Sequence, residues 1–222
     1  MLENIKAVIF DLDGTLADSM TVWTDIDKAF FAGRKIPVPD TLQKDIEGMS
    51  FTETAAYFVK TFSLPESVEE LKEIWRDQAM EQYRDHVKLK PGVLEFLSYL
   101  KEHRIRTGIA TSNSRNLLNA FLEGRRLFPY IDAAVTSCDV SAGKPAPDVY
   151  LKTAALLETS PEECLVFEDV PMGILAGKNA DMKVCAVEDD YSIDQTEKKR
   201  ELADYYIHDY FDVLRSSYEV LP

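Results

Sequence analysis

The chain has 222 residues, of which 45% are hydrophobic, and this length suffices for one large domain or two modest ones. It carries 39 acidic against 25 basic side chains, which gives a formal net charge of −14. The resulting negative field repels nucleic acids and anionic membranes, so neither is an expected partner, and it favours a monomer.

Two further features of the sequence concern the compartment. The first residues show no basic segment leading into a long apolar run, and no apolar run approaches membrane-spanning length. None of the three cysteines belongs to a Cys-x-x-Cys pair, and Cys164 and Cys185 lie in or beside apolar runs, as buried thiols do in a reducing compartment. We therefore expect a cytoplasmic protein.

The first predicted strand ends in two carboxylates. Residues 7–10 form a continuous apolar run, typical of a strand buried on both faces of a parallel sheet. Asp11 and Asp13 follow, and because side chains alternate along an extended chain, both carboxylates point the same way. Two such charges at the end of a buried strand need a cation between them or a proton on one of them. Helix capping would explain one of these aspartates, but not two on one face.

The chain from residue 16 to residue 87 predicts an all-helical module. Apolar and aromatic residues recur at helical spacing over 19–31, 41–46, 51–61 and 67–86, and no strand-like run interrupts them. The sequence Ser67-Val-Glu-Glu70 predicts a capping box at the start of the last helix.

From residue 88 onward, helices and strands alternate. We expect strands over 106–110, 133–136, 165–167, 183–187 and 205–207, and helices over 93–102, 116–123, 147–157 and 172–180. This alternation predicts an α/β fold with a parallel sheet and helices on both of its faces. The simplest architecture is one α/β core, residues 1–15 and 88–222, into which the helical module 16–87 is inserted after the first strand.

Polar residues gather where the predicted strands end, and ligands of open parallel sheets bind beyond these carboxyl ends. The candidates are four carboxylates, two hydroxyls and one lysine: Asp11, Asp13, Thr111, Ser112, Lys144, Glu168 and Asp169. Oxygen ligands suit a hard divalent cation, and Mg²⁺ is the usual occupant where a phosphate shares the site. A lysine and a hydroxyl suit phosphate oxygens, and a nucleophilic carboxylate beside a carboxylic acid suits phosphoryl transfer through an aspartyl-phosphate. Taken singly, Thr111 fits a turn, Lys144 a solvated surface and the Glu168-Asp169 pair a helix dipole, so the prediction rests on their combination.

Four segments of the chain resemble the motifs of a known family. They are Asp-Leu-Asp-Gly-Thr-Leu (11–16), Thr111 after an apolar strand, Gly-Lys-Pro-Ala-Pro-Asp (143–148) and Phe-Glu-Asp-Val-Pro-Met-Gly (167–173). In this order they resemble the four motifs of the haloacid dehalogenase superfamily, and most of all its phosphatase and β-phosphoglucomutase-like branch. The resemblance implies a Rossmann-like parallel-sheet core and an inserted helical cap that closes over the substrate.

The resemblance also implies roles for the motif residues. Asp11 would attack phosphorus, and Asp13 would protonate the leaving oxygen and then activate water. The implied activity is that of a magnesium-dependent phosphatase acting on a small phosphorylated metabolite such as a sugar phosphate. The phosphoryl oxygens would be held by Thr111, Ser112 and Lys144. The implied Mg²⁺ site is formed by Asp11, the Asp13 carbonyl, Glu168 and Asp169.

Two alternative functions remain open at this stage. The first is a β-phosphoglucomutase, and two differences count against it. Such a mutase has a branched apolar residue where this chain has Thr15, and an arginine where this chain has Phe51 after Gly48-Met-Ser50. A phospho-acceptor of the response-regulator type uses similar residues, but its acidic pair ends the first strand and its acceptor comes later, the reverse of the order here. The motifs do not specify the substrate. Aromatic residues of the helical module are expected mostly in its interior, and one or two of Trp23, Met49 and Phe51 are expected to face the cleft.

Overall fold

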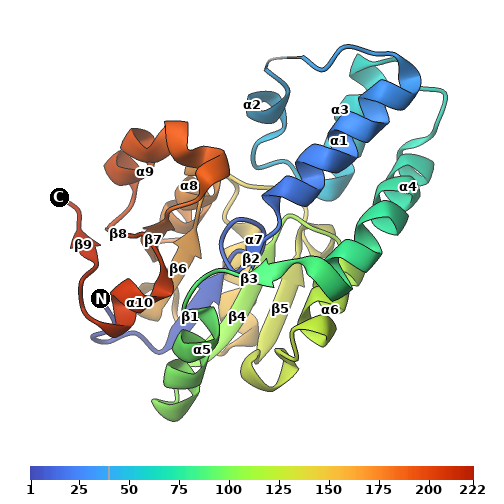
Figure 1. Cartoon of the computed structure of the whole chain (residues 1–222). Helices are drawn as coiled ribbons and strands as arrows, with labels where there is room; N and C mark the ends of the chain where they lie inside the picture. The colour runs from blue at the N-terminus through green and yellow to red at the C-terminus, as the bar shows by residue number, and fades with distance from the viewer. Residues whose placement is uncertain (40) are drawn as a thin grey trace.

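The computed structural model describes residues 1–39 and 41–222, and a seven-stranded sheet lies at its centre. The strand order is β5-β4-β1-β6-β7-β8-β9, with β1 between β4 and β6 (Figure 1). Neighbouring strands from β5 to β8 are parallel, and β9 is antiparallel to β8. The strands are β1 (Ala7–Phe10), β4 (Arg106–Thr111), β5 (Ala133–Thr136), β6 (Cys164–Glu168), β7 (Lys183–Val187), β8 (Tyr205–Ile207) and β9 (Glu219–Val220). The predicted α/β fold is confirmed.

Helices cover both faces of the sheet, as the alternation along β1 shows. Val8 and Phe10 belong to a buried cluster that includes side chains of α5, α6 and α10, whereas Ala7 and Ile9 belong to a second cluster with α7 and α8. All four residues of β1 are fully buried, which explains why the strand reads as an unbroken apolar run. The helices of the core are α5 (Val93–Glu102), α6 (Arg115–Gly124), α7 (Asp148–Leu156), α8 (Pro171–Asn179), α9 (Thr196–Leu202) and α10 (Tyr210–Leu214).

A second group of helices lies between β2 (Ala17–Asp18) and β3 (Lys88–Leu89), and we call this segment the insert. Capping boxes at Ser50 and at Ser67 start its third and fourth helices, the second of them as predicted. Its interior is aromatic, with the ring of Phe58 4.8 Å from that of Trp75. The helices are α1 (Met20–Arg34), α2 (Leu42–Ile46), α3 (Phe51–Thr61), α4 (Val68–Glu81) and a π-helical turn, η1 (Gln82–His86).

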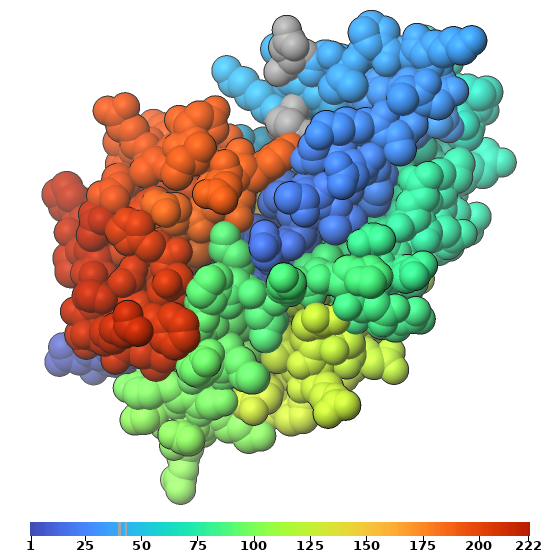
Figure 2. Space-filling model, in the orientation of Figure 1, coloured from blue at the N-terminus to red at the C-terminus, as the bar shows by residue number. Residues whose placement is uncertain are grey.

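Two short antiparallel strands join the insert to the core. Ala17 of β2 pairs with Leu89 of β3, so both connections cross at one place (Figure 1). The expectation that the helical block contains no strand is thus wrong at its first residues, because a two-residue strand has no periodicity that a sequence could show. Figure 2 shows the insert, coloured blue to turquoise-green, lying over the core and against the orange segment that holds η5 (Asp190–Gln195) and α9.

Several elements of the last 35 residues are not predicted by the sequence. The turn η5 and the helices α9 and α10 are short, and β9 has two residues, so none reaches the length at which a hydrophobic period becomes visible. Cys164 and Cys185 are buried free thiols, as expected. No helix within residues 1–39 and 41–222 combines the length and the hydrophobicity that crossing a bilayer requires.

Candidate active site

The carboxyl ends of β1, β4 and β6 open into a cavity of about 810 Å³ between the sheet and the insert. The strand register explains this convergence, since Phe10 pairs with both Ile109 and Phe167, and the backbone N–H of Asp11 donates to the Phe167 carbonyl at 3.0 Å. The residues that follow these strands therefore meet at one edge. All seven residues that the sequence singles out line this cavity: Asp11, Asp13, Thr111, Ser112, Lys144, Glu168 and Asp169.

Lys144 forms a buried ion-pair bridge. Its ammonium Nζ lies 2.6 Å from Asp11 Oδ1 and 2.5 Å from Glu168 Oε1, and the phenol of Tyr150 donates a second hydrogen bond to that Glu168 oxygen at 2.7 Å. Burial lowers the pKa of Lys144, but the charges of Asp11 and Glu168 outweigh this and raise it above its ordinary value. The reading of Lys144 as a solvated surface residue is therefore excluded.

Three buried carboxylates form the candidate metal site. Oxygens of Asp11, Glu168 and Asp169 lie within 4.8 Å of one another. Burial, with the charges of Glu168 and Asp13 added to it, raises the pKa of Asp11 to about 8 although the ammonium of Lys144 opposes this. Burial and the neighbouring carboxylates also raise the pKa of Asp169 well above its ordinary value. When all three carboxylates are ionised, the single ammonium leaves two negative charges uncompensated, which is the charge that a divalent cation supplies.

Backbone geometry brings Asp169 close to the end of β1. Gly14 has a φ of +78°, and a Cβ there would lie 2.3 Å from Asp169 Oδ2, so only glycine fits this turn. Next to it, the Thr15 hydroxyl donates to Asp169 Oδ1 at 2.8 Å. Oxygen-only donors of this kind suit a hard cation such as Mg²⁺. The carboxylate of Asp13 is not among these donors; the expectation for Asp13 concerned its carbonyl.

The last residue of β4 and the residue that follows it, Thr111 and Ser112, line the cavity with hydroxyl side chains. Thr111 Oγ1 accepts a hydrogen bond from the Asn113 backbone N–H at 3.0 Å, which leaves the hydroxyl proton available for another acceptor. The Ser112 carbonyl accepts from the backbone N–H of Phe51 at 3.0 Å and from the hydroxyl of Ser137 at 2.8 Å. Ser112 is thus held from the insert on one side and from the end of β5 on the other.

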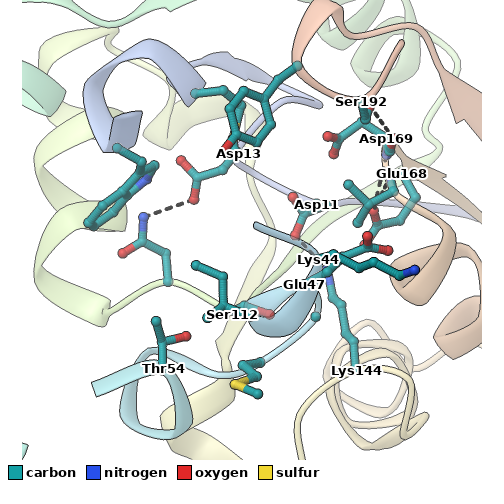
Figure 3. Close-up of a pocket in the computed structure, with 18 of the residues that line it drawn as sticks. Asp11, Asp13, Lys44, Glu47, Thr54, Ser112, Lys144, Glu168, Asp169 and Ser192 are labelled. Atoms are coloured by element: carbon teal, nitrogen blue, oxygen red, sulfur yellow. Dashed lines mark hydrogen bonds and ion pairs between the residues drawn. The ribbon is translucent and has the colours of Figure 1, made fainter. Parts of the chain in front are cut away.

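Asp13 lies across the cavity from Glu168 and Asp169, with Asp11 between them (Figure 3). Its carboxylate accepts hydrogen bonds from Ser19 Oγ at 2.5 Å, from Asn113 Nδ2 at 2.9 Å and from the Tyr83 hydroxyl. Burial and then the charge of Asp13 raise the pKa of Tyr83 well above its ordinary value, so the phenol keeps its proton and donates it.

Sequence reasoning assigned no role to these three partners of Asp13. Asn113 stands next to Thr111 and Ser112, and this position is a signal that could have identified it. Tyr83 lies 70 residues from Asp13 in the chain and belongs to an aromatic pattern typical of a helix core, so nothing in the sequence pairs the two.

The insert closes the cavity from the other side. Trp23, Met49 and Phe51 all line it, although the sequence favours only one or two of them, and Trp75 lines it as well. At the end of α2, the carboxylate of Glu47 accepts hydrogen bonds from two parts of the core: the backbone N–H of Met172 at the start of α8 (3.3 Å) and Gln195 Nε2 of η5 (3.0 Å). The following glycine, Gly48, has a φ of +77°, and a Cβ there would lie 2.9 Å from the Lys144 carbonyl. The insert is therefore in direct contact with the loop that carries the bridging lysine.

Comparison with known proteins gives a consistent result. The chain matches the family model described as haloacid dehalogenase-like hydrolase over residues 8–187. It is 30% identical over 176 residues to a phosphorylated carbohydrates phosphatase of Thermotoga maritima, covering 79% of this chain and 82% of that protein. It is 33% identical over 184 residues to hexitol phosphatase A of Escherichia coli, covering 82% of each.

Solved structures share the fold over almost the whole chain. CbbY of Rhodobacter sphaeroides in complex with phosphate superposes with a TM-score of 0.81 at 20% identity, covering 94% of this chain and 96% of that one. For β-phosphoglucomutase of Clostridium difficile the TM-score is 0.80 at 20% identity, with 96% of each chain covered.

Proposed function

Because the chain belongs to the haloacid dehalogenase-like hydrolase family, we propose that it is a magnesium-dependent phosphatase that hydrolyses a small phosphorylated metabolite, such as a sugar phosphate, through an aspartyl-phosphate. Phosphoric monoester hydrolysis is the activity named for relatives that align with most of the chain. The observation that carries the proposal is the position of Asp11: it is paired with Lys144, stands in an acidic cluster and shares a cavity with Asp13.

The residues present fit a magnesium ion. Asp11, Glu168, Asp169 and the carbonyl of Asp13 would hold it, and its two charges would balance the excess that these carboxylates leave after pairing with Lys144. When bound, the ion reduces the repulsion between a carboxylate nucleophile and an anionic phosphate.

The side chains then divide the reaction between them. A carboxylate oxygen of Asp11 forms a bond to phosphorus as the ester P–O bond breaks, and Asp13 gives its proton to the leaving oxygen. Lys144, with the hydroxyls of Thr111 and Ser112, holds the phosphoryl oxygens in place. Water then attacks the acyl phosphate, its proton passes to Asp13, and Asp11 is released with inorganic phosphate.

We further propose that residues 16–87 act as a cap over a core formed by residues 1–15 and 88–222. Supporting this division, the two connections between the parts run side by side through β2 and β3. Away from that hinge, the contacts between the parts include those of Glu47 and the hydrogen bond between Phe51 and Ser112. A cap that opens and closes over the cavity would admit the substrate and then exclude water.

The surroundings of Phe51 favour a phosphatase over a mutase. Its ring is buried, and the centroid of this ring lies 6.1 Å from that of Trp23 and 6.0 Å from that of Trp75. This position is therefore part of an aromatic wall. It offers no cation to the far phosphate of a bisphosphate, whose charges need one. In a mutase of this branch an arginine occupies the equivalent position.

A panel of phosphorylated metabolites with Mg²⁺ and an inorganic-phosphate readout tests the proposal. We expect phosphate release, and a loss of roughly 10³-fold or more in Asp11→Asn, because the nucleophile is gone. Asp181→Asn, on an exposed residue of the core, is the matched control and should keep wild-type activity. Turnover of Asp11→Asn near the wild-type rate would exclude Asp11 as nucleophile. Conversion of β-glucose 1-phosphate to glucose 6-phosphate without phosphate release, in the presence of catalytic bisphosphate, would identify a mutase instead.

A further inference from the structure

The hydrogen bonds around Asp13 assign a function to a tyrosine of the insert. Resting on the proposed function, in which Asp13 protonates the leaving oxygen, we propose that Tyr83 is a positioning residue. It orients the Asp13 carboxyl so that Oδ2, and not Oδ1, transfers the proton. The argument depends on which atoms around Tyr83 can donate and which can accept.

The direction of the Tyr83 hydroxyl is fixed by its neighbours. The indole Nε1 of Trp23 lies 2.6 Å from the Tyr83 oxygen, and indole N–H is a donor only. Asn113 Nδ2 lies 3.1 Å from the same oxygen, and its identity as nitrogen follows from Asn113 Oδ1, which accepts from the backbone N–H of Ser114 at 2.7 Å. Two donors thus occupy both lone pairs of the phenol oxygen, so its single proton points to Asp13 Oδ1.

This arrangement distinguishes the two oxygens of Asp13. Oδ1 accepts from Tyr83 and also from Ser19 Oγ at 2.5 Å, which fills both of its lone pairs. In the part of the chain that the structure describes, Oδ2 accepts from Asn113 Nδ2 alone, at 2.9 Å. One lone pair of Oδ2 is therefore left to carry the proton to the leaving oxygen and later to take one from water.

Tyr83 is held firmly enough to act in this way. It is fully buried and lies in the π-helical turn η1, which packs against α6 of the core. In that contact Arg125 donates to the Arg84 carbonyl at 2.8 Å, and a Cβ on Gly124 would lie 1.8 Å from the same carbonyl oxygen. The glycine allows the turn to approach this closely, and so places the phenol beside Asp13.

Trp23 connects this arrangement to the substrate cavity. Its indole lines the cavity and also donates a hydrogen bond to Tyr83. A residue of the cavity wall therefore also orients Tyr83, which in turn orients Asp13. Trp23 lies on α1 and Tyr83 at the far end of the insert. The hydrogen-bonded chain from Trp23 through Tyr83 to Asp13 therefore requires both ends of the insert to be docked.

A pair of aryl phosphates of similar shape tests the role of Tyr83. 4-Nitrophenolate leaves readily without a proton, whereas phenolate is a stronger base and gains more from protonation. Since kcat/KM extends only to the first irreversible step, it reports formation of the acyl phosphate and loss of the leaving group. We expect Tyr83→Phe to lower the ratio of kcat/KM for phenyl phosphate over 4-nitrophenyl phosphate by about tenfold or more, part of what a positioned acid contributes. A purely structural loss would lower both values together and leave their ratio unchanged.

Two further variants keep the test decisive. Trp23→Phe keeps an aromatic ring but removes the donor that orients Tyr83. It should therefore lower the same kcat/KM ratio, by a smaller factor than Tyr83→Phe does, and it replaces Tyr83→Phe in the test if that variant does not fold. Tyr99→Phe on α5 is the control and should leave the ratio at the wild-type value. If Tyr83→Phe folds and its ratio of kcat/KM for the two esters equals that of the wild type, the proposed role of Tyr83 is overturned. If Tyr83→Phe does not fold, an unchanged ratio in Trp23→Phe overturns it. No phosphate release by the wild-type protein from either ester or from any member of the metabolite panel would instead overturn the proposed phosphatase.

Discussion

The core and the insert contribute to the same cavity in different ways. The core supplies charged groups from strand ends whose register is fixed, and it neutralises them partly through the buried bridge of Lys144 to Asp11 and Glu168. The insert supplies side chains of mixed character from separate helices, among them the aromatic rings of Trp23 and Trp75. Under the proposed function, the core would perform the phosphoryl transfer, and the insert would determine the substrate and the timing of closure.

The largest effect should come from removing the bridging cation of the core. Lys144→Ala leaves Asp11 and Glu168 buried without their ammonium, and it removes a preorganised charge from the phosphoryl group. We expect kcat/KM for 4-nitrophenyl phosphate at saturating Mg²⁺ to fall by about 10²-fold or more. Lys178→Ala is the control, because Lys178 pairs with Asp204 at the surface. A folded Lys144→Ala with activity near that of the control would show that the core does not depend on this charge.

The core site was predictable because its residues follow strands that the sequence reveals. The apolar run of β1 and the motif order were enough to place Asp11, Lys144 and Asp169 at one edge, and the structure brings them into one cavity. The strand β4 is one residue longer than predicted and includes Thr111, which does not change this result.

The contribution of the insert could not be predicted in the same way. The partner of Tyr83 is determined by the packing of a π-helical turn on Gly124, and a hydrophobic period carries no information about such a contact. Glu47 at the end of α2 would be assigned to a solvated surface, since only the folded chain brings Gln195 and Met172 to it. The sequence thus identifies residues at regular strand ends and fails where distant loops meet.

A smaller effect should follow from loosening the contact between the two regions. Glu47→Ala removes the acceptor for Met172 N and Gln195 Nε2, so we expect the closed arrangement to be less populated. The chain has two tryptophans, Trp23 and Trp75, and both line the cavity, so their fluorescence reports its closure. Acrylamide should quench the tryptophan fluorescence of Glu47→Ala more strongly than that of the wild type. We expect kcat/KM to be lower by about fivefold, the low end of the range for two partly exposed hydrogen bonds.

Glu73→Ala, on an exposed residue of the same insert, is the control for this experiment. Equal quenching in Glu47→Ala and Glu73→Ala would mean that the Glu47 contacts do not hold the insert closed, and that the remaining contacts, such as that between Phe51 and Ser112, are sufficient.

The smallest effect concerns the charge balance of the core in the absence of metal. Burial and neighbouring carboxylates raise the pKa of Asp11 to about 8, whereas in an unfolded chain an aspartate has a pKa of about 3.9. Between these values the folded state retains a proton that the unfolded state has released, so the free energy of unfolding decreases as the pH rises through this window. In a chelator, the melting temperature should therefore be lower at pH 8 than at pH 5.5.

Added Mg²⁺ should reverse this loss, and by more at pH 8 than at pH 5.5, because at the lower pH the ion competes with protons for the same carboxylates. Asp11→Asn cannot ionise at this position, so its melting temperature in chelator should depend less on pH than that of the wild type. The measurement is a thermal melt of both proteins at the two pH values, with and without Mg²⁺. An equal increase in melting temperature from Mg²⁺ at both pH values would contradict the assignment of Asp11 to the metal site. The charge excess of the core would then have to be balanced by protons alone.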